Sequence, residues 1–158
     1  MRYFLASCCV VLAGCASFDG SSLRAGASEA DVVRTMGEPA LRLANPDGSR
    51  ALVYPHGPLG IKTYIARLGR DGVLIHVDSV LNDDQFFHVQ AGMTRDEVLR
   101  MIGPPGDTMA FARSNQVAWD YRYMDTWGYL AEFSVTFDVT GHVVSKFKRR
   151  FERDQGLF

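Results

Sequence analysis

The chain has 158 residues, of which 47% are hydrophobic and 22% are charged, and its 17 basic and 18 acidic residues leave a formal net charge of −1. This length is typical of a domain that can bury a hydrophobic core. The balance of charge gives no reason to expect a nucleic-acid partner, because domains that bind nucleic acids carry a clear excess of Lys and Arg.

A short apolar segment at the N-terminus ends in Leu12-Ala13-Gly14-Cys15, which resembles the lipobox of a bacterial lipoprotein signal. One cation, Arg2, precedes the apolar run Tyr3–Ala13. That run is too short for a permanent transmembrane helix, which needs roughly 20 residues. We therefore predict that residues 1–14 are a signal peptide and that Cys15 is acylated and becomes the first residue of the mature protein.

A second candidate, Leu5-Ala6-Ser7-Cys8, fits the same loose pattern but would leave a leader too short for export. The opposing interpretation, cysteines packed in a buried helix, is disfavoured because the residues after Cys15 read as a linker. Residues 15–22 are thus predicted to be the acylated cysteine and its linker. With Cys8 and Cys9 removed, no thiol would remain for a disulfide or a metal site.

An internal repeat organises the rest of the sequence. Leu23–Pro39 matches Val89–Pro105 at a constant offset of 66 residues, and six of seventeen positions are identical. In both copies a Ser or Thr is followed three residues later by an acid, which is the spacing of a capping box, and a Gly-x-Pro sequence ends the apolar stripe. The repeat therefore predicts two short helices of about nine residues each. Their predicted structural caps are Ser28, Gly37, Thr94 and Gly103.

Alternating apolar residues after each helix predict antiparallel strands with one buried face. Glycine-containing turns at Asp71-Gly72 and Thr140-Gly141 favour a hairpin before the last strand of each copy. The predicted strands are Arg50–Tyr54, Lys62–Leu68, Val73–Asp78, Val117–Tyr123, Phe133–Val139 and Val143–Phe147.

The predicted fold class is α+β, with two tandem units, each a short helix packed on a three-stranded antiparallel meander. Unit 1 spans residues 23–82 and unit 2 spans residues 83–158, including a basic C-terminal tail. The acidic pair Asp83-Asp84 at the boundary is expected to be a polar linker between the units.

Three motifs of unit 2 resemble one protein family. The helix Gly92–Pro105, the aromatic strand Trp119–Tyr123 and the Phe-Asp-x-x-Gly turn at Phe137–Gly141 are similar to those of the SmpA/OmlA (BamE-like) outer-membrane lipoprotein family. The match is good for residues 89–147 and fainter for 23–78. This resemblance implies a non-enzymatic domain anchored on the periplasmic side of the outer membrane. The sequence departs from the family pattern because it carries the unit twice.

The predicted function is that of a protein-binding accessory or scaffold in envelope biogenesis. Its expected partners are outer-membrane lipid, which it contacts through acylated Cys15, and the β-barrel assembly complex. The alternative is a periplasmic inhibitor or regulator of an enzyme that uses its concave sheet, because the tandem arrangement is also similar to that of the β-lactamase inhibitory proteins. A membrane tether favours the scaffold, since an inhibitor that acts at a distance gains nothing from it.

No residue pattern predicts catalysis, a cofactor or a metal site. The four histidines are far apart in sequence and lack zinc-type spacing, and no phosphate loop or nucleophile elbow is present. Gly57-Pro58-Leu59-Gly60 is read as a turn. The histidines are His56, His76, His88 and His142.

Aromatic and basic residues of unit 2 are the candidates for partner contacts. Trp127 and Tyr129 are predicted to lie in a loop beside Gly128, where no alternation demands burial, so they are the better candidates for a partner surface. For Trp127 a cap on the sheet edge is the alternative. A C-terminal basic run is read as a solvated strand end, with an anionic lipid or an acidic partner as the alternative. That run comprises Lys146, Lys148, Arg149, Arg150 and Arg153.

Overall fold

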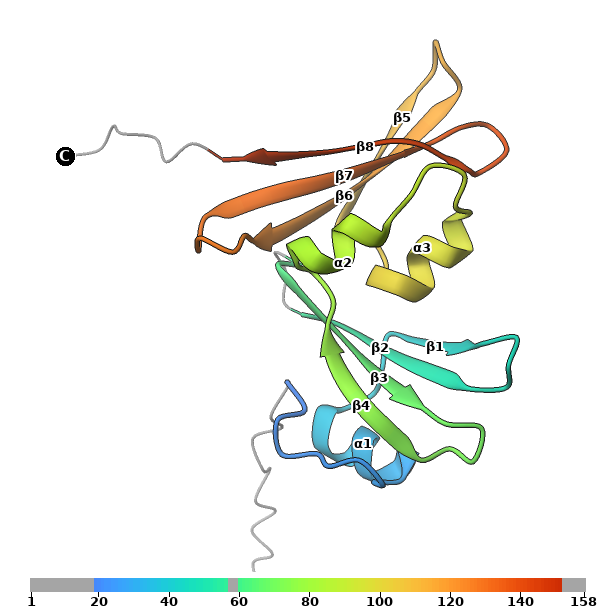
Figure 1. The fold of residues 1–158 in the computed structure, drawn as a ribbon, viewed down its shortest axis with the longest axis vertical. Coiled ribbons are helices and arrows are strands. Elements are labelled where there is room, and N and C mark those ends of the chain that lie inside the picture. Colours follow the sequence, from blue (N-terminus) through green and yellow to red (C-terminus); the bar gives the residue numbers. More distant parts are fainter. Residues whose placement is uncertain (1–18, 57–59, 152–158) are drawn as a thin grey trace, which may run out of the picture.

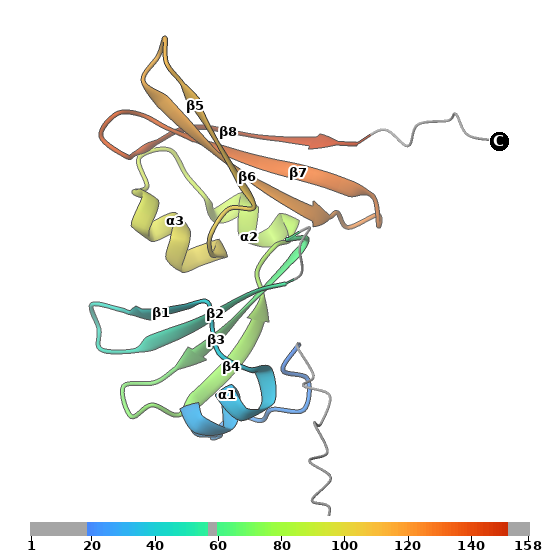
Figure 2. The ribbon, with the colours of Figure 1, turned by 180° about the vertical axis from the view of Figure 1, so that it is seen from behind.

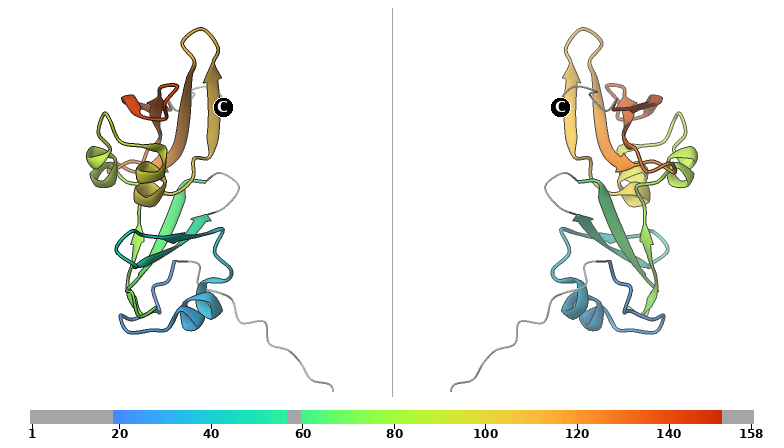
Figure 3. Two further views of the ribbon diagram at one scale, coloured as in Figure 1. Left: turned by 90° about the vertical axis from the view of Figure 1, so that its right-hand side faces the viewer. Right: turned by 90° about the vertical axis from the view of Figure 1, so that its left-hand side faces the viewer.

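The structure is a computed structural model that describes residues 19–56 and 60–151, and its elements form four stacked layers (Figures 1 and 3). The layers are α1, a first four-stranded sheet, the pair α2 and α3, and a second four-stranded sheet. The predicted signal peptide and Cys15 lie outside the described residues. The α+β class and the two tandem units are confirmed.

Both sheets are antiparallel and keep the order of their strands along the chain. The first sheet contains β1 (Leu41–Ala44), β2 (Arg50–His56), β3 (Lys62–Leu68) and β4 (Leu74–Ser79). The second contains β5 (Asp107–Phe111), β6 (Gln116–Met124), β7 (Leu130–Phe137) and β8 (Val143–Arg150). Each sheet therefore has one strand more than the predicted meander.

The additional strands, β1 and β5, each begin four residues after a cap glycine and carry little periodic signal. β1 has only four residues, and all five residues of β5 are exposed, so β5 shows no buried face in its sequence. Val139, predicted to continue a strand, is 71% exposed because β7 ends at Phe137 and Asp138 begins the turn.

The repeated helices are α1 (Glu29–Met36) and α3 (Arg95–Ile102), and each begins with a complete capping box. The hydroxyls of Ser28 and Thr94 accept a hydrogen bond from the backbone N–H of the acid three residues later, at 3.2 Å in both helices. Gly37 and Gly103 end the helices with φ of 86° and 80°. This backbone conformation favours glycine because a side chain would be strained there.

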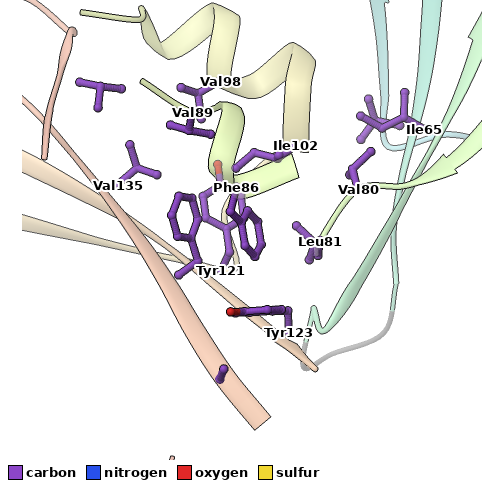
Figure 4. Packing of buried hydrophobic residues seen from close by; sticks show 14 of the residues in the cluster. Ile65, Val80, Leu81, Phe86, Val89, Val98, Ile102, Tyr121, Tyr123 and Val135 are labelled. Carbon is purple, nitrogen blue, oxygen red and sulfur yellow. The ribbon is translucent and has the colours of Figure 1, made fainter. Parts of the chain in front are cut away.

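The expected linker at Asp83-Asp84 is a helix instead. Residues Asp83–His88 form α2, which Asn82 caps by accepting a hydrogen bond from the backbone N–H of Gln85. Six residues are too few for a helix to be stable alone. Phe86, 2% exposed, anchors α2 between Tyr123 and Phe133, with its ring 4.1 Å from that of Phe133 (Figure 4).

The two faces of the first sheet are covered by different units. One face packs on α1 in a cluster that includes Val32, Met36 and Leu52. The other face belongs to a larger cluster that also contains residues of α2, α3 and the second sheet (Figure 2). In this cluster Ile65 and Val80 of unit 1 are buried together with Ile102 of α3 (Figure 4). Unit 1 therefore completes its burial with a helix of unit 2.

Gly103 is a point of close approach between the units. A Cβ atom at this position would lie 2.9 Å from Cγ2 of Thr63 and 3.3 Å from Cγ1 of Val53, whereas a Cβ at Gly37 would meet nothing within 4 Å. The two cap glycines thus have the same local role, but Gly103 also allows α3 to contact the first sheet.

Replacing each cap glycine by alanine separates backbone strain from packing. Both variants place a side chain at positive φ, but only Gly103→Ala also crowds Thr63. We expect Gly103→Ala to lower the free energy of unfolding by about 1–2 kcal/mol more than Gly37→Ala in urea titrations. Thr63→Ser in the Gly103→Ala background should recover part of this difference, because it removes Cγ2. Equal losses in the two single variants would contradict the packing role of Gly103.

Candidate protein-binding surface

Trp127 and Tyr129 lie at the tip of the β6–β7 hairpin, with 78% and 53% of their surface exposed. The tip is a tight turn held by Asp125, whose carboxylate accepts hydrogen bonds from the backbone N–H groups of Trp127 and Tyr129, both at 2.9 Å. Gly128 provides the positive φ, 78°, that the turn requires. The turn therefore presents two aromatic side chains from a fixed backbone.

Arg150 of β8 completes this turn. Its Nε–H donates to Asp125, whose side chain is 6% exposed, and its guanidinium lies 5.1 Å from the ring centre of Tyr129. Although burial raises it, hydrogen bonds from the Tyr129 amide and Arg150 lower the pKa of Asp125 below its usual range. The carboxylate thus stays ionised and holds Arg150 beside the aromatic tip.

Two lysines of β8 hold α2 at its two ends. Lys146 Nζ donates to the backbone carbonyls of Phe86 and Phe87, at 3.2 and 3.0 Å, and to that of Val89. These carbonyls end α2, where a cation is favoured by the helix dipole. Lys148 Nζ lies 2.6 Å from Asp83 in the first turn of the helix. The lysines therefore stabilise a helix that would be too short to form alone.

Asp83 is the centre of the cluster that joins α2 to the second sheet. It accepts hydrogen bonds from Tyr123 Oη at 2.9 Å, Thr126 Oγ1 at 3.0 Å and Lys148 Nζ at 2.6 Å. Although burial raises it, the hydrogen bonds from Lys148, Tyr123 and Thr126 lower the pKa of Asp83 to about 2. Asp83 is thus a structural anchor, whereas the sequence predicted a solvated linker residue.

The basic run is partnered inside the molecule over its described part. Arg149, like the other three cations, has an internal partner: its Nε lies 2.8 Å from Oε1 of Glu132. Lys146, Lys148 and Arg150 recur at every second position, so they share the face of β8 that looks toward α2 and the hairpin tip. This alternation is the signal in the sequence that could have revealed internal partners. Arg153 lies outside the described residues.

Two adjoining pockets follow β8. The Phe pocket, about 340 Å³, lies between α2 and β8 and is lined mainly by Phe86, Phe87, Phe133 and Phe147. The polar pocket, about 300 Å³, is lined by residues that include Trp127, Arg149 and Arg150. Asp83 and Lys148 line both pockets, so the two are continuous. The candidate surface therefore comprises the hairpin tip and part of the basic run, for which the sequence left a partner contact as the alternative.

His76 and His142 each contact a residue nearby in the sequence. His76 Nε2 lies 3.0 Å from Asp78, and His142 Nδ1 lies 2.8 Å from Thr140 Oγ1. Among residues 19–56 and 60–151, no group of three or more His, Cys, Asp or Glu side chains is arranged to hold a metal ion. No helix in that part of the chain is both long and apolar enough to cross a membrane.

Comparison with known proteins finds a family model that matches part of the chain. Residues 79–146 match the family model described as the outer membrane protein assembly factor BamE domain. A search of curated proteins finds no match.

Solved structures provide more distant likenesses. An osmotically inducible lipoprotein, OsmE, is 27% identical over 41% of this chain and 68% of its own, with a TM-score of 0.38. A protein from Streptococcus mutans, described as a candidate β-lactamase inhibitor, is 12% identical over 83% of this chain and 87% of its own, with a TM-score of 0.35. The DUF4309 family protein YjgB from Bacillus subtilis is 13% identical over 79% of both chains, with a TM-score of 0.30. The likeness to the BamE domain family rests on the sequence match of residues 79–146 alone.

The Asp83 cluster predicts a dependence of stability on pH. Because the pKa of Asp83 in the folded state is below its unfolded value of about 3.9, its contribution is full above that value and is lost as the pH falls towards 2. Asp83→Asn should lower the free energy of unfolding by roughly 1–2 kcal/mol at pH 7 and by much less at pH 2. Urea titrations at both pH values measure this, with exposed Asp84→Asn as the control. Equal stability of Asp83→Asn and wild type at pH 7 would rule out the anchor.

Proposed function

We propose, from the match of residues 79–146 to the outer membrane protein assembly factor BamE domain, that the chain is a non-enzymatic accessory lipoprotein of the bacterial envelope. The finer proposal is that it assists β-barrel protein assembly at the periplasmic face of the outer membrane. The family match supports the envelope role. The rigid, exposed aromatic tip at Trp127 and Tyr129 is the observation that supports action through protein contacts.

The anchor proposed at Cys15 would hold unit 1 close to the membrane. Gly20 already packs on unit 1, since a Cβ atom there would lie 3.1 Å from Sδ of Met36. Three residues separate Cys15 from Asp19, so the chain between them reaches about 14 Å at most. Trp127 lies in the turn between β6 and β7, which belong to the second sheet, and α2 and α3 lie between the two sheets (Figure 1). In this arrangement unit 1 is the membrane-proximal spacer and unit 2 receives the partner.

The first test concerns the anchor. One acyl chain binds a protein to membranes only marginally. Each buried methylene adds about 0.8 kcal/mol of binding free energy, so several chains attach the protein almost permanently. Cys15→Ser should therefore release the protein from the outer-membrane fraction after a carbonate wash, as followed by immunoblotting. If this variant stayed with outer membranes, the lipoprotein proposal would be wrong. Wild-type protein retained in the inner membrane would refute the outer-membrane location.

The second test concerns the aromatic tip. The double variant Trp127→Ala/Tyr129→Ala should lose most co-purification of barrel-assembly subunits after cross-linking in envelopes, while its unfolding midpoint changes little because both side chains are exposed. Met109→Ala/Phe111→Ala on β5 is the matched control, since it also removes two exposed apolar side chains from unit 2.

Unchanged co-purification in the Trp127→Ala/Tyr129→Ala variant would remove the tip from the docking surface. Capture of one soluble hydrolase in place of assembly subunits would favour the inhibitor alternative, which nothing beyond the two-unit architecture supports.

A further inference from the structure

We propose that the Phe pocket and the cations along the free edge of β8 form one groove that receives an extended acidic segment of a partner protein, with an aromatic side chain of that segment in the pocket. This deepens the proposed function, on which it rests for the assumption that the partner is a protein. The groove is defined by the two adjoining pockets along β8 and by the cations Lys148, Arg149 and Arg150.

The charge of the groove is positive toward solvent even though each cation is paired. Each pair places its acid inside and its cation outside. Exposure of the side chains is 25% for Asp83 against 51% for Lys148, and 9% for Glu132 against 56% for Arg149. For Asp125 and Arg150 the values are 6% and 52%. Because the acids are buried under the cations, the surface presented to a partner complements negative charge.

The arginines retain donors for a second carboxylate. Both contact their internal acid through Nε, so the Nη groups are not used in these hydrogen bonds. A guanidinium carries five N–H donors and can bind carboxylates with two of them at once. Lys146 differs, because backbone carbonyls at the end of α2 already engage its ammonium. The carboxylates of the partner are therefore assigned to Arg149 and Arg150.

The apolar half of the groove fits an aromatic anchor. Phe87 and Phe147 are 71% and 55% exposed at its rim, and the buried rings of Phe86 and Phe133 line it as well. Large exposed apolar side chains around a pocket are typical of protein interaction sites, and aromatic anchors often carry most of the binding energy. Burying an aromatic ring here would cover the two exposed phenylalanines.

The geometry of β8 sets the spacing in the partner. The strand lies at the edge of its sheet, and Phe147 and Arg150 are three positions apart along it, which is about 10 Å. An extended segment running beside the edge would cover the same distance in three residues. For a segment that runs parallel to β8, the groove thus matches a motif in which an aromatic residue is followed, two to three residues later, by acidic residues. A segment that runs antiparallel to β8 would have the reverse order.

Fluorescence anisotropy with the full-length protein in detergent tests this proposal. The probe is a fluorescein-labelled peptide of sequence Gly-Phe-Ser-Glu-Asp-Glu-Gly. Its controls replace either Phe by Ala or all three acids by Lys. We expect the acidic aromatic peptide to bind at least about tenfold more tightly than either control, because only it supplies both the aromatic anchor and the negative charge. Its affinity should fall as NaCl rises from about 0.05 to about 0.5 M, because salt screens the charges.

Variants then locate the binding site. Phe87→Ser should weaken binding about tenfold, since Phe87 is exposed and its loss leaves no buried cavity. Arg149→Gln/Glu132→Gln removes an outward cation without leaving a buried charge and should reduce both affinity and its dependence on salt. The control Arg42→Gln/Glu38→Gln neutralises an exposed ion pair on unit 1, distant from the groove in the sequence, and should have no effect.

Each outcome bears on one proposal only. Equal affinity for the acidic and the lysine peptide, no detectable binding, or unchanged affinity of Phe87→Ser would overturn the groove. Peptide binding needs neither an anchor nor an assembly complex. Normal peptide binding by a protein whose Cys15 and Trp127 variants behave as wild type in the envelope would therefore refute the proposed function while leaving the groove intact.

Discussion

The rest of the structure depends on helix α3 being buried on two sides. Val98 and Ile102 are fully buried, and their cluster contains residues of both sheets, such as Val53 and Val135. Without α3, one face of the first sheet would expose its aliphatic side chains to water, at a cost of roughly 25 cal/mol for each Å². The absence of a side chain at Gly103 makes this contact possible, and Arg100 strengthens it by donating to Asn45 of unit 1. The two units therefore share one core and are joined by more than a linker.

The stack of layers ends at the second sheet for a chemical reason. Val53 and Ile65 are directly opposed on β2 and β3 and face α3, whereas the corresponding opposed pair on β6 and β7 is Asp120 and Ser134, joined by a hydrogen bond of 2.5 Å. A polar pair in the centre of this face removes the incentive to pack a further apolar helix on it. Terminal units of stacked proteins need such a polar outer face. The proposed binding surfaces are the edge at β8 and the hairpin tip.

Charge organises this edge from the inside. Asp83 and Asp125 are held by cations from β8, and in doing so they fix α2 and the aromatic turn to the same strand. One set of contacts thus stabilises the fold and aligns the candidate surface, since the apolar and the basic parts of the groove are both built on β8. The internal use of these residues also explains why a run of cations occurs in a chain with a formal net charge of −1.

Sequence alone determined the features whose causes are local. Capping boxes, cap glycines and period-two alternation act within a few residues, and they correctly located α1, α3 and six of the eight strands. Short elements with no face of their own were not predictable: β5 is exposed throughout, and α2 exists because Lys146 and Lys148, about 60 residues away, hold its ends. For the candidate surface, sequence indicated Trp127 and Tyr129 but not their partners. Only the tertiary structure decided that Asp83 is an anchor and that the cations of β8 pair with buried acids. The partner of a charged side chain is the residue that lies beside it in space, which can be far away in the sequence.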